Sequence, residues 1–328
     1  MSTVKNLPRR SVLGILAVTA ASWWPAARGN TPTSTTPLRI GFQKGSINLT
    51  IMKSQRYVEQ RLPNTPVQWI EFPAGPQLLE ALAVGSVDFG SVGDSPPVFA
   101  QAAGKDIFYV GAEPTKPDTS ALLVREGSPL KTLADLKGKR IALQKGSSSH
   151  FLLVQIVKRA GLQWSDIQPI YLAPADARAA FERGSVDGWV IWDPYYAAAE
   201  LDGKVRPLIT SRGLTSNNSF YLASRSLAQQ EPVLRHLFSA LTETDAHVYK
   251  NRGETAKQYA EFSGLGLATV LRFLERRPRS PVGPLTPALI AEQQKVADTF
   301  HELGLIPKAI RVADIVWQPG QQVAQATR

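Results

Sequence analysis

Two polar loops with nearly the same sequence lie about a hundred residues apart in this chain. Residues 43–46 read Gln-Lys-Gly-Ser, and residues 144–149 read Gln-Lys-Gly-Ser-Ser-Ser. Glycine allows a ligand to approach the backbone closely, and serine offers a hydroxyl. Each loop precedes a predicted helix, whose first N–H groups are free to attract an anion. The pair predicts a site for a tetrahedral oxyanion such as a sulfonate, built from neutral donors, although each serine alone could be only a helix cap.

Further candidates follow the third predicted strand of each repeat, where ligands bind in open parallel sheets. Asp94 and Asp193 could each cap the next helix, which is their simplest role. Trp192 packs either on the apolar part of a ligand or in the core. Glu113 faces either a cationic or hydroxyl group of a ligand or the protein surface. We expect the ligand to be bound by Gln43, Gly45, Ser46, Gly93, Asp94, Ser95, Glu113, Ser147, Ser148, Ser149, Trp192 and Asp193.

Signatures of an enzyme are missing from the sequence. The four histidines show no metal-ligand spacing, there is no cysteine, and neither a G-x-S-x-G elbow nor a Walker-type loop is present. Lys44 and Lys145 belong to the two loops, but we expect both to be solvated. The sequence therefore predicts no catalytic residue, no metal site and no cofactor.

Composition and charge narrow the class of protein. The chain has 328 residues, 43% of them hydrophobic and 20% charged, which is typical of a globular protein large enough for two domains. The formal net charge is +10, but residues 1–30 hold four basic residues and no acidic one. The remaining basic residues are scattered and form no nucleic-acid motif, so we expect no nucleic-acid partner.

The N-terminal residues have the pattern of an export signal. Lys5, Arg9 and Arg10 precede an apolar stretch, residues 12–21, that is too short to span a bilayer. The adjacent arginines are also typical of twin-arginine export. Cleavage after Ala27 or Gly29 would fit the small residues there. The sequence predicts that residues 1–30 are a signal peptide and that the mature protein is periplasmic.

The elements that position these residues alternate in both repeats. Strands are expected at 38–42, 67–72, 87–91, 140–143, 167–172 and 186–192, and helices at 47–61, 75–83, 150–160 and 174–183, with Ser46 as a helix cap. This order predicts an α/β fold with a mostly parallel sheet in each of two lobes. Strand-like residues 107–112 and 220–224 would be the crossings. The first expected lobe is residues 38–112 plus 220–328, and the second is residues 113–219. We expect the helical tail of the first lobe, including a helix from Thr286-Pro287 to before Gly304, to pack back on that lobe.

Several longer runs carry a family resemblance. They are residues 38–46, 71–80, 84–97, 99–104, 133–149, 174–181, 190–196 and 317–319. On these runs the chain resembles the periplasmic solute-binding proteins of ABC importers of the nitrate/sulfonate/taurine type, and most of all their aliphatic sulfonate-binding members. Residues 210–218 depart from that pattern.

The resemblance implies a type II periplasmic binding fold with two crossover strands and a ligand cleft between lobes that close on a hinge. It implies a monomer that captures an alkanesulfonate and delivers it to a permease of the inner membrane for sulfur acquisition. Taurine, nitrate or another small oxyanion is the alternative ligand. An enzyme similar to the synthases of thiamine precursors is the alternative of another class, although those enzymes use Cys- and His-rich features that this chain lacks.

Overall fold

The first of two sheets is built mainly from the N-terminal part of the chain. A computed structural model describes residues 36–113, 115–279 and 281–320. In this sheet β1 pairs in parallel with β2 and β3, and β10 is antiparallel to both of its neighbours, so four of the five strands run in one direction. The strand order is β2 (Val67–Glu71), β1 (Leu38–Phe42), β3 (Phe89–Gly93), β10 (Ser219–Ser224) and β4 (Ile107–Glu113).

The second sheet repeats this arrangement. Here β6 pairs in parallel with β7 and β8, and β5 is antiparallel to β8 and β9, so again four strands share one direction. The order is β7 (Gln168–Tyr171), β6 (Arg140–Leu143), β8 (Gly188–Trp192), β5 (Ser120–Arg125) and β9 (Val205–Thr210). The mostly parallel sheets predicted from the two repeats are therefore confirmed, and the internal similarity extends to strand order.

The sequence Gly-Ser-Val-Asp occurs in both repeats, at residues 85–88 and 184–187, and its aspartate holds the start of one strand in each sheet. Asp88 accepts a hydrogen bond of 2.8 Å from the backbone N–H of Arg39, and Asp187 accepts one of 2.8 Å from Arg140. Each aspartate also pairs with the guanidinium of the same arginine. The motif thus joins the start of one strand to the turn before its neighbour, at the strand ends opposite to the two Gln-Lys-Gly-Ser loops.

Twelve α-helices connect and cover the strands of the described part of the chain. They are α1 (Ile47–Ser54), α2 (Tyr57–Arg61), α3 (Gly75–Ala83), α4 (Ser95–Ala102), α5 (Ser148–Arg159), α6 (Pro174–Glu182), α7 (Tyr195–Leu201), α8 (Arg225–Ala228), α9 (Glu231–Lys250), α10 (Arg252–Ser263), α11 (Leu267–Arg276) and α12 (Pro287–Glu302).

The single helix predicted for residues 47–61 is wrong, because the structure divides it into two helices. Residues 47–61 form α1 and α2, because Arg56 adopts a left-handed backbone with φ of 54°, which ends the first helix. Ser46 occupies the N-cap position of α1, but its side chain makes no capping hydrogen bond. The predicted position of Ser46 as the N-cap residue is therefore confirmed, but its hydroxyl does not form the cap. By contrast, the helix predicted to open at Thr286-Pro287 forms as α12, and the Thr286 hydroxyl caps it by accepting from the N–H of Leu289.

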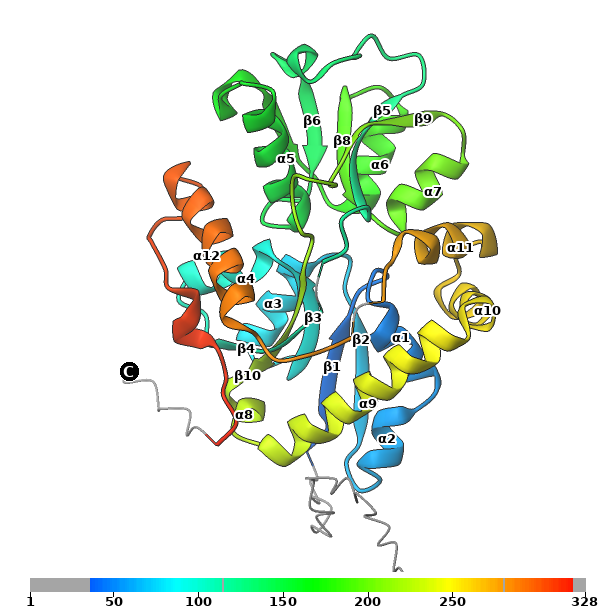
Figure 1. The fold of residues 1–328 in the computed structure, drawn as a ribbon, viewed down its shortest axis with the longest axis vertical. Coiled ribbons are helices and arrows are strands. Elements are labelled where there is room, and N and C mark those ends of the chain that lie inside the picture. The colour runs from blue at the N-terminus through cyan, green and yellow to red at the C-terminus, as the bar shows by residue number, and fades with distance from the viewer. Residues whose placement is uncertain (1–35, 114, 280, 321–328) are drawn as a thin grey trace, which may run out of the picture. The chain divides into compact units, whose positions relative to one another are not determined.

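The chain passes between the two sheets twice. It leaves the first sheet after β4 and enters the second at β5, then returns between β9 and β10. The described residues all belong to one compact unit, Pro32–Arg328, in which Figure 1 shows one sheet above the other. The predicted lobe boundaries stay a prediction, and the predicted signal peptide lies outside the described residues.

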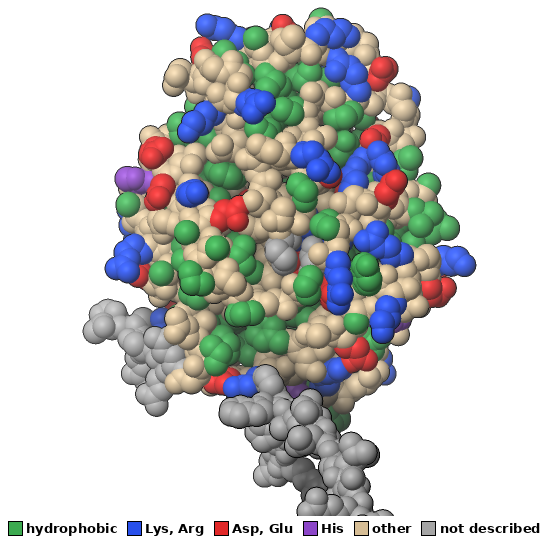
Figure 2. All heavy atoms as spheres, in the orientation of Figure 1, with side chains coloured by type: hydrophobic (Ala, Val, Ile, Leu, Met, Phe, Trp, Pro, Cys, Tyr) green, Lys and Arg blue, Asp and Glu red, His purple; other side chains and the backbone are tan. Residues whose placement is uncertain are grey.

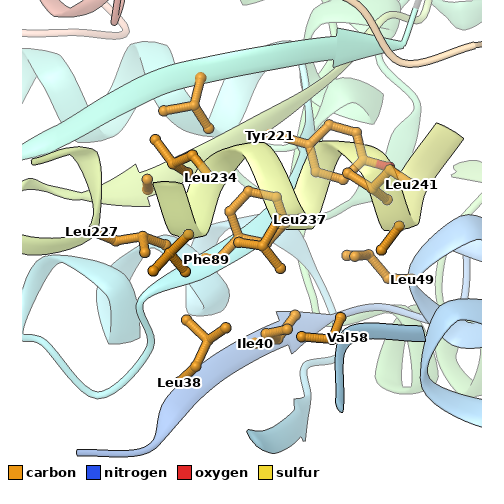
Figure 3. Close-up of a cluster of buried hydrophobic side chains, with 14 of the residues drawn as sticks. Leu38, Ile40, Leu49, Val58, Phe89, Tyr221, Leu227, Leu234, Leu237 and Leu241 are labelled. Carbon is orange, nitrogen blue, oxygen red and sulfur yellow. The ribbon is translucent and has the colours of Figure 1, made fainter. Parts of the chain in front are cut away.

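The C-terminal helices complete the core of the first sheet. Figure 3 shows Leu234, Leu237 and Leu241 of α9 packed near Leu38 and Ile40 of β1, all of them buried. Burial of such side chains is the main favourable term in folding. The helical tail therefore packs back on the first sheet, as predicted from the sequence.

A second cluster places α12 against the other face of the same sheet. Val296 and Phe300 of α12 are buried with Leu78 of α3 and Val98 of α4. Among the helices of residues 36–320 that the structure describes, none is long and apolar enough to cross a membrane. On the face seen in Figure 2, acidic and basic side chains of the described residues are interspersed, without a patch of one sign.

Candidate functional site

A small polar pocket of about 90 Å³ lies where the strands of the two sheets end. Nine of the twelve predicted site residues line it, namely Gln43, Gly45, Ser46, Gly93, Glu113, Ser147, Ser148, Trp192 and Asp193. They lie at or just after the carboxyl ends of β1, β3 and β4 in the first sheet and of β6 and β8 in the second. The topology thus brings together residues that are 150 positions apart in sequence.

The two Gln-Lys-Gly-Ser loops meet at this pocket. Ser46 stands before α1, and Ser148 is the first residue of α5. The Gln43 side-chain amide donates to the carbonyl of Ser91 at 2.9 Å, and the Ser147 hydroxyl donates to the carbonyl of Gln144 at 2.8 Å. These bonds hold the loops in shape, and the free N–H groups of two helix starts add partial positive charge at the pocket.

Three predicted residues do not line the pocket. Asp94 and Ser95 are buried at the start of α4, where the Ser95 hydroxyl donates to the Asp94 carboxylate at 2.9 Å. Asp94 already has a helical backbone, so its side chain does not cap α4, and that predicted role is wrong. Burial raises the pKa of Asp94. The Ser149 hydroxyl, in the first turn of α5, is buried away from solvent and has no hydrogen-bond partner.

Asp193 has the capping role that its position predicts. Its Oδ1 accepts from the N–H of Ala197 at 2.9 Å in the first turn of α7. The same oxygen accepts from Nη1 of Arg276 at 3.0 Å. Burial raises the pKa of Asp193 to about 7, although the Arg276 charge opposes this change. Asp193 is therefore held inside the protein by one helix start and one cation.

Glu113 is fully engaged with other residues of the chain. Its carboxylate accepts from Arg277 at 2.5 Å, Asn48 at 3.0 Å and the Tyr221 hydroxyl at 2.6 Å, and pairs with Lys116 at 3.4 Å. Burial alone would raise the pKa of Glu113, but the two cations and the hydrogen bonds bring it down to about 2. The carboxylate is thus ionised, and its acceptor positions are occupied by the protein.

Two buried cations at the pocket were missed by reasoning from the sequence. Lys116 and Arg277 both line it and are only 5% and 6% exposed. Burial lowers the pKa of Lys116 to about 8, with Glu113 opposing the change, so the ammonium is still charged at neutral pH. Together with one carboxylate they leave an excess of one positive charge at the pocket. Two signals were available in the sequence. Lys116 is a basic residue just after a crossing strand, and Arg277 is a basic residue at a helix end, directly before Pro278.

The return crossing supplies further polar groups that the sequence did not predict. Asn217 and Asn218 line the pocket, in the stretch 210–218 that departs from the family pattern. The Asn217 amide donates to the hydroxyls of Thr119 at 2.8 Å and Ser120 at 2.7 Å. Because Thr119 lies on the outgoing crossing, these bonds tie the two crossings together beside the pocket.

Aromatic side chains form the apolar wall, and the two sides of the pocket touch. Trp192 at the end of β8 and Phe273 on α11 line the pocket together with Pro96. A Cβ added to Gly45 would lie 3.1 Å from the carbonyl oxygen of Asp193 and 3.7 Å from the Trp192 ring. Gly45 therefore allows the first loop to lie directly against the end of β8. The arrangement can hold a compact anion with a short apolar group.

The paired sheets of equal order, the two crossings and the pocket between them define the two-lobed type II fold of periplasmic binding proteins. The sequence profile of the NMT1/THI5-like family matches residues 67–251, and the chain belongs to this family.

Individual relatives agree with this assignment. A protein of Escherichia coli (strain K12) named as an aliphatic sulfonates-binding protein is 46% identical over 319 residues, which cover 97% of this chain and 98% of that protein. The structure is similar to that of the alkanesulfonate-binding protein of Xanthomonas axonopodis pv. citri bound to MOPS, with a TM-score of 0.84, 48% identity, and coverage of 87% of this chain and 99% of that one.

A second solved structure is similar as well. The periplasmic aliphatic sulphonate binding protein of Escherichia coli has a TM-score of 0.79 and 48% identity, and the match covers 87% of this chain and 98% of that one. These relatives confirm the resemblance seen in the sequence, and all three are named as binding proteins.

Proposed function

We propose that this chain is the substrate-binding component of an ABC importer, and that it captures aliphatic sulfonates in the periplasm for delivery to a membrane permease. The relatives named for sulfonate binding support the ligand class, and the periplasmic relative supports the compartment. The predicted export signal at residues 1–30 supports the same compartment. A binding role without turnover fits a pocket whose buried acids are engaged with cations or hydroxyls.

The observation that carries the proposal is the buried cluster of Glu113, Lys116 and Arg277. Its excess of one positive charge matches a sulfonate, which stays a monoanion over the physiological pH range. A buried charge is costly unless it is paired, so a bound anion would complete this cluster. Serine hydroxyls at two helix starts, Ser46 and Ser148, supply the further donors that three sulfonate oxygens need.

The pocket walls favour an alkyl sulfonate over the alternative anions. Nitrate has no apolar part to contact Trp192 and Phe273, which line the pocket. Taurine would need an acceptor for its ammonium group, and the Glu113 carboxylate is already occupied by four donors. We therefore expect Glu113→Gln to leave the ratio of the Kd values for taurine and ethanesulfonate within about twofold of wild type.

Calorimetry on protein recovered from the periplasm of an expressing host tests the proposal. The ligands are 1-propanesulfonate, butanoate, nitrate and taurine, in phosphate or Tris, because MOPS and other sulfonate buffers would compete. We expect a Kd for 1-propanesulfonate in the micromolar range or below, and binding of butanoate at least tenfold weaker.

The outcomes separate the ligand from the class of protein. Binding of nitrate or taurine alone would keep the transport role and replace the ligand. Failure to bind any of the four anions would contradict the proposed function. A thermal melt adds a check, since a ligand at 100 times its Kd stabilises the folded state by about 2.7 kcal/mol.

A further inference from the structure

Helix α11 ends at Arg276, and the side chains of this residue and of the next, Arg277, reach different sheets. Arg276 donates from Nη1 to Oδ1 of Asp193 at 3.0 Å, directly after β8 of the second sheet. Arg277 donates from Nη2 to Oε2 of Glu113 at 2.5 Å, at the end of β4 in the first sheet. Both side chains are buried, at 8% and 7% exposed. One short segment therefore holds both sides of the pocket.

The other contacts of the Arg276 guanidinium lie on α7, the helix that follows β8 of the second sheet. Besides Asp193, its guanidinium pairs with Glu200 and stacks on the Tyr196 ring, with the Cζ atom 3.7 Å from the ring centre. Glu200 and Tyr196 lie on α7. A guanidinium that is stacked and paired in this way loses all these contacts together if α7 moves away.

Helix α11 itself is anchored on the first sheet's side. Its Val270, Phe273 and Leu274 are buried mainly with residues of that side, including Ile47 and Ile51 of α1, although Ala197 of α7 joins the same cluster. The residue directly after the helix is Arg277, and its carbonyl accepts a hydrogen bond of 2.8 Å from the Arg252 side chain on α10. Figure 1 shows α11 beside α10 and directly next to α7. Arg276 thus projects from one half of the pocket and binds the other half.

A second arginine one turn earlier provides a comparison. Arg272 also pairs with Glu200, at 2.8 Å, but it is 38% exposed and shares its charge with Glu275 on its own helix. Water and salt screen this partly exposed pair more than the pair of Arg276 and Asp193, whose side chains are only 8% and 1% exposed, so we expect it to contribute less. The buried pair of Arg276 and Asp193 is therefore the polar contact between α11 and the second sheet that separation would disrupt most.

We propose that Arg276 is a positioning residue for ligand retention, which holds Asp193 and α7 against the pocket and so sets the rate at which ligand leaves. This inference rests on the proposed function. Asp193 lines the pocket, and its carbonyl oxygen lies against Gly45 of the first loop. Because Arg277 is the next residue and lines the same pocket, an anion bound there would fix the end of α11 and with it Arg276.

Stopped-flow measurements of 1-propanesulfonate binding test this role, with the intrinsic tryptophan fluorescence of the protein, to which Trp192 at the pocket contributes, as the signal. We expect Arg276→Gln to raise koff about tenfold or more and to leave kon within twofold, because loss of a buried charge pair acts on dissociation. Arg272→Gln is the matched control and should leave both rates within twofold. Arg276→Lys should give an intermediate koff. A residue that is merely structural would lower the amount of active protein without this separation of rates.

Equal koff values for Arg276→Gln and Arg272→Gln would overturn the proposal, as would a loss confined to kon. If Arg276→Gln does not fold, Asp193→Asn should show the same raised koff, and a wild-type koff in that variant would contradict the role. If the wild type binds no sulfonate, the proposed function fails separately. Small-angle scattering then decides on Arg276, because a larger radius of gyration for Arg276→Gln than for Arg272→Gln supports it and equal radii refute it.

Discussion

The two sides of the pocket start from the same loop sequence and differ in charge. On the first-sheet side, residues 43–46 lie beside Glu113, Lys116 and Arg277, all buried. On the second-sheet side, residues 144–149 contribute hydroxyls and the start of α5, and the one acid that lines the pocket, Asp193, is neutralised by Arg276. One side carries net charge, and the other is nearly neutral.

This difference shows that the repeat supplies geometry, while charge comes from outside it. The repeated loops place two helix starts at one pocket. Lys116 lies on the outgoing crossing, and Arg277 lies in the helical tail that follows β10. Neither position has a counterpart in the other repeat, so a duplicated scaffold has acquired a single cationic side.

The largest effect on this contrast is expected from removing the Arg277 guanidinium, one of the two cations on the first-sheet side. Arg277→Met should raise the Kd for 1-propanesulfonate about 100-fold, since truncating a buried, hydrogen-bonded charge typically costs this much or more. Calorimetry measures the change. Arg277→Lys keeps the charge and should recover part of the affinity. Near-wild-type binding by Arg277→Met would mean that the two sides contribute alike.

Lys116 sharpens the comparison through pH. An anion favours the charged ammonium, so binding takes up a proton once the pH exceeds about 8, the pKa of Lys116 in the free protein. We expect the Kd to rise about tenfold per pH unit above that value, and the contribution of Lys116 to be constant below it. Titrations in two buffers of different ionisation enthalpy measure the proton uptake.

Two variants separate this effect from general charge. Lys116→Met should bind more weakly at pH 7 and show no such dependence on pH. Lys145→Met removes an exposed lysine of the second loop and should keep the wild-type pH profile. A pH profile that is unchanged in Lys116→Met would assign the titration to another group.

The smallest effect is expected on the neutral side. Ser148→Ala removes one hydroxyl from the pocket and should raise the Kd about threefold to tenfold, independent of pH. Ser46→Ala makes the equivalent change in the first loop and should have a similar effect. If Ser148→Ala exceeded Arg277→Met, the charged side would not dominate binding.

The elements predicted from the sequence were those fixed by local patterns. The strand at 38–42, the helix capped by Thr286 and the two loops at strand ends depend on alternation, caps and glycines within a few residues. The break at Arg56 was missed, because a left-handed arginine leaves no local signal. Lys116 and Arg277 were missed for another reason. Their burial depends on a partner up to 164 residues away, Glu113, and on packing that no local pattern reports.

The two crossings also bear on how the chain folds during synthesis. All five strands of the second sheet lie in one continuous stretch, from Ser120 to Thr210, so this sheet can be completed from neighbouring residues. The first sheet needs β10 and then α9 and α12, which are made last. Contacts distant in sequence form slowly. The half of the molecule that begins first at the ribosome is therefore the half that is finished last.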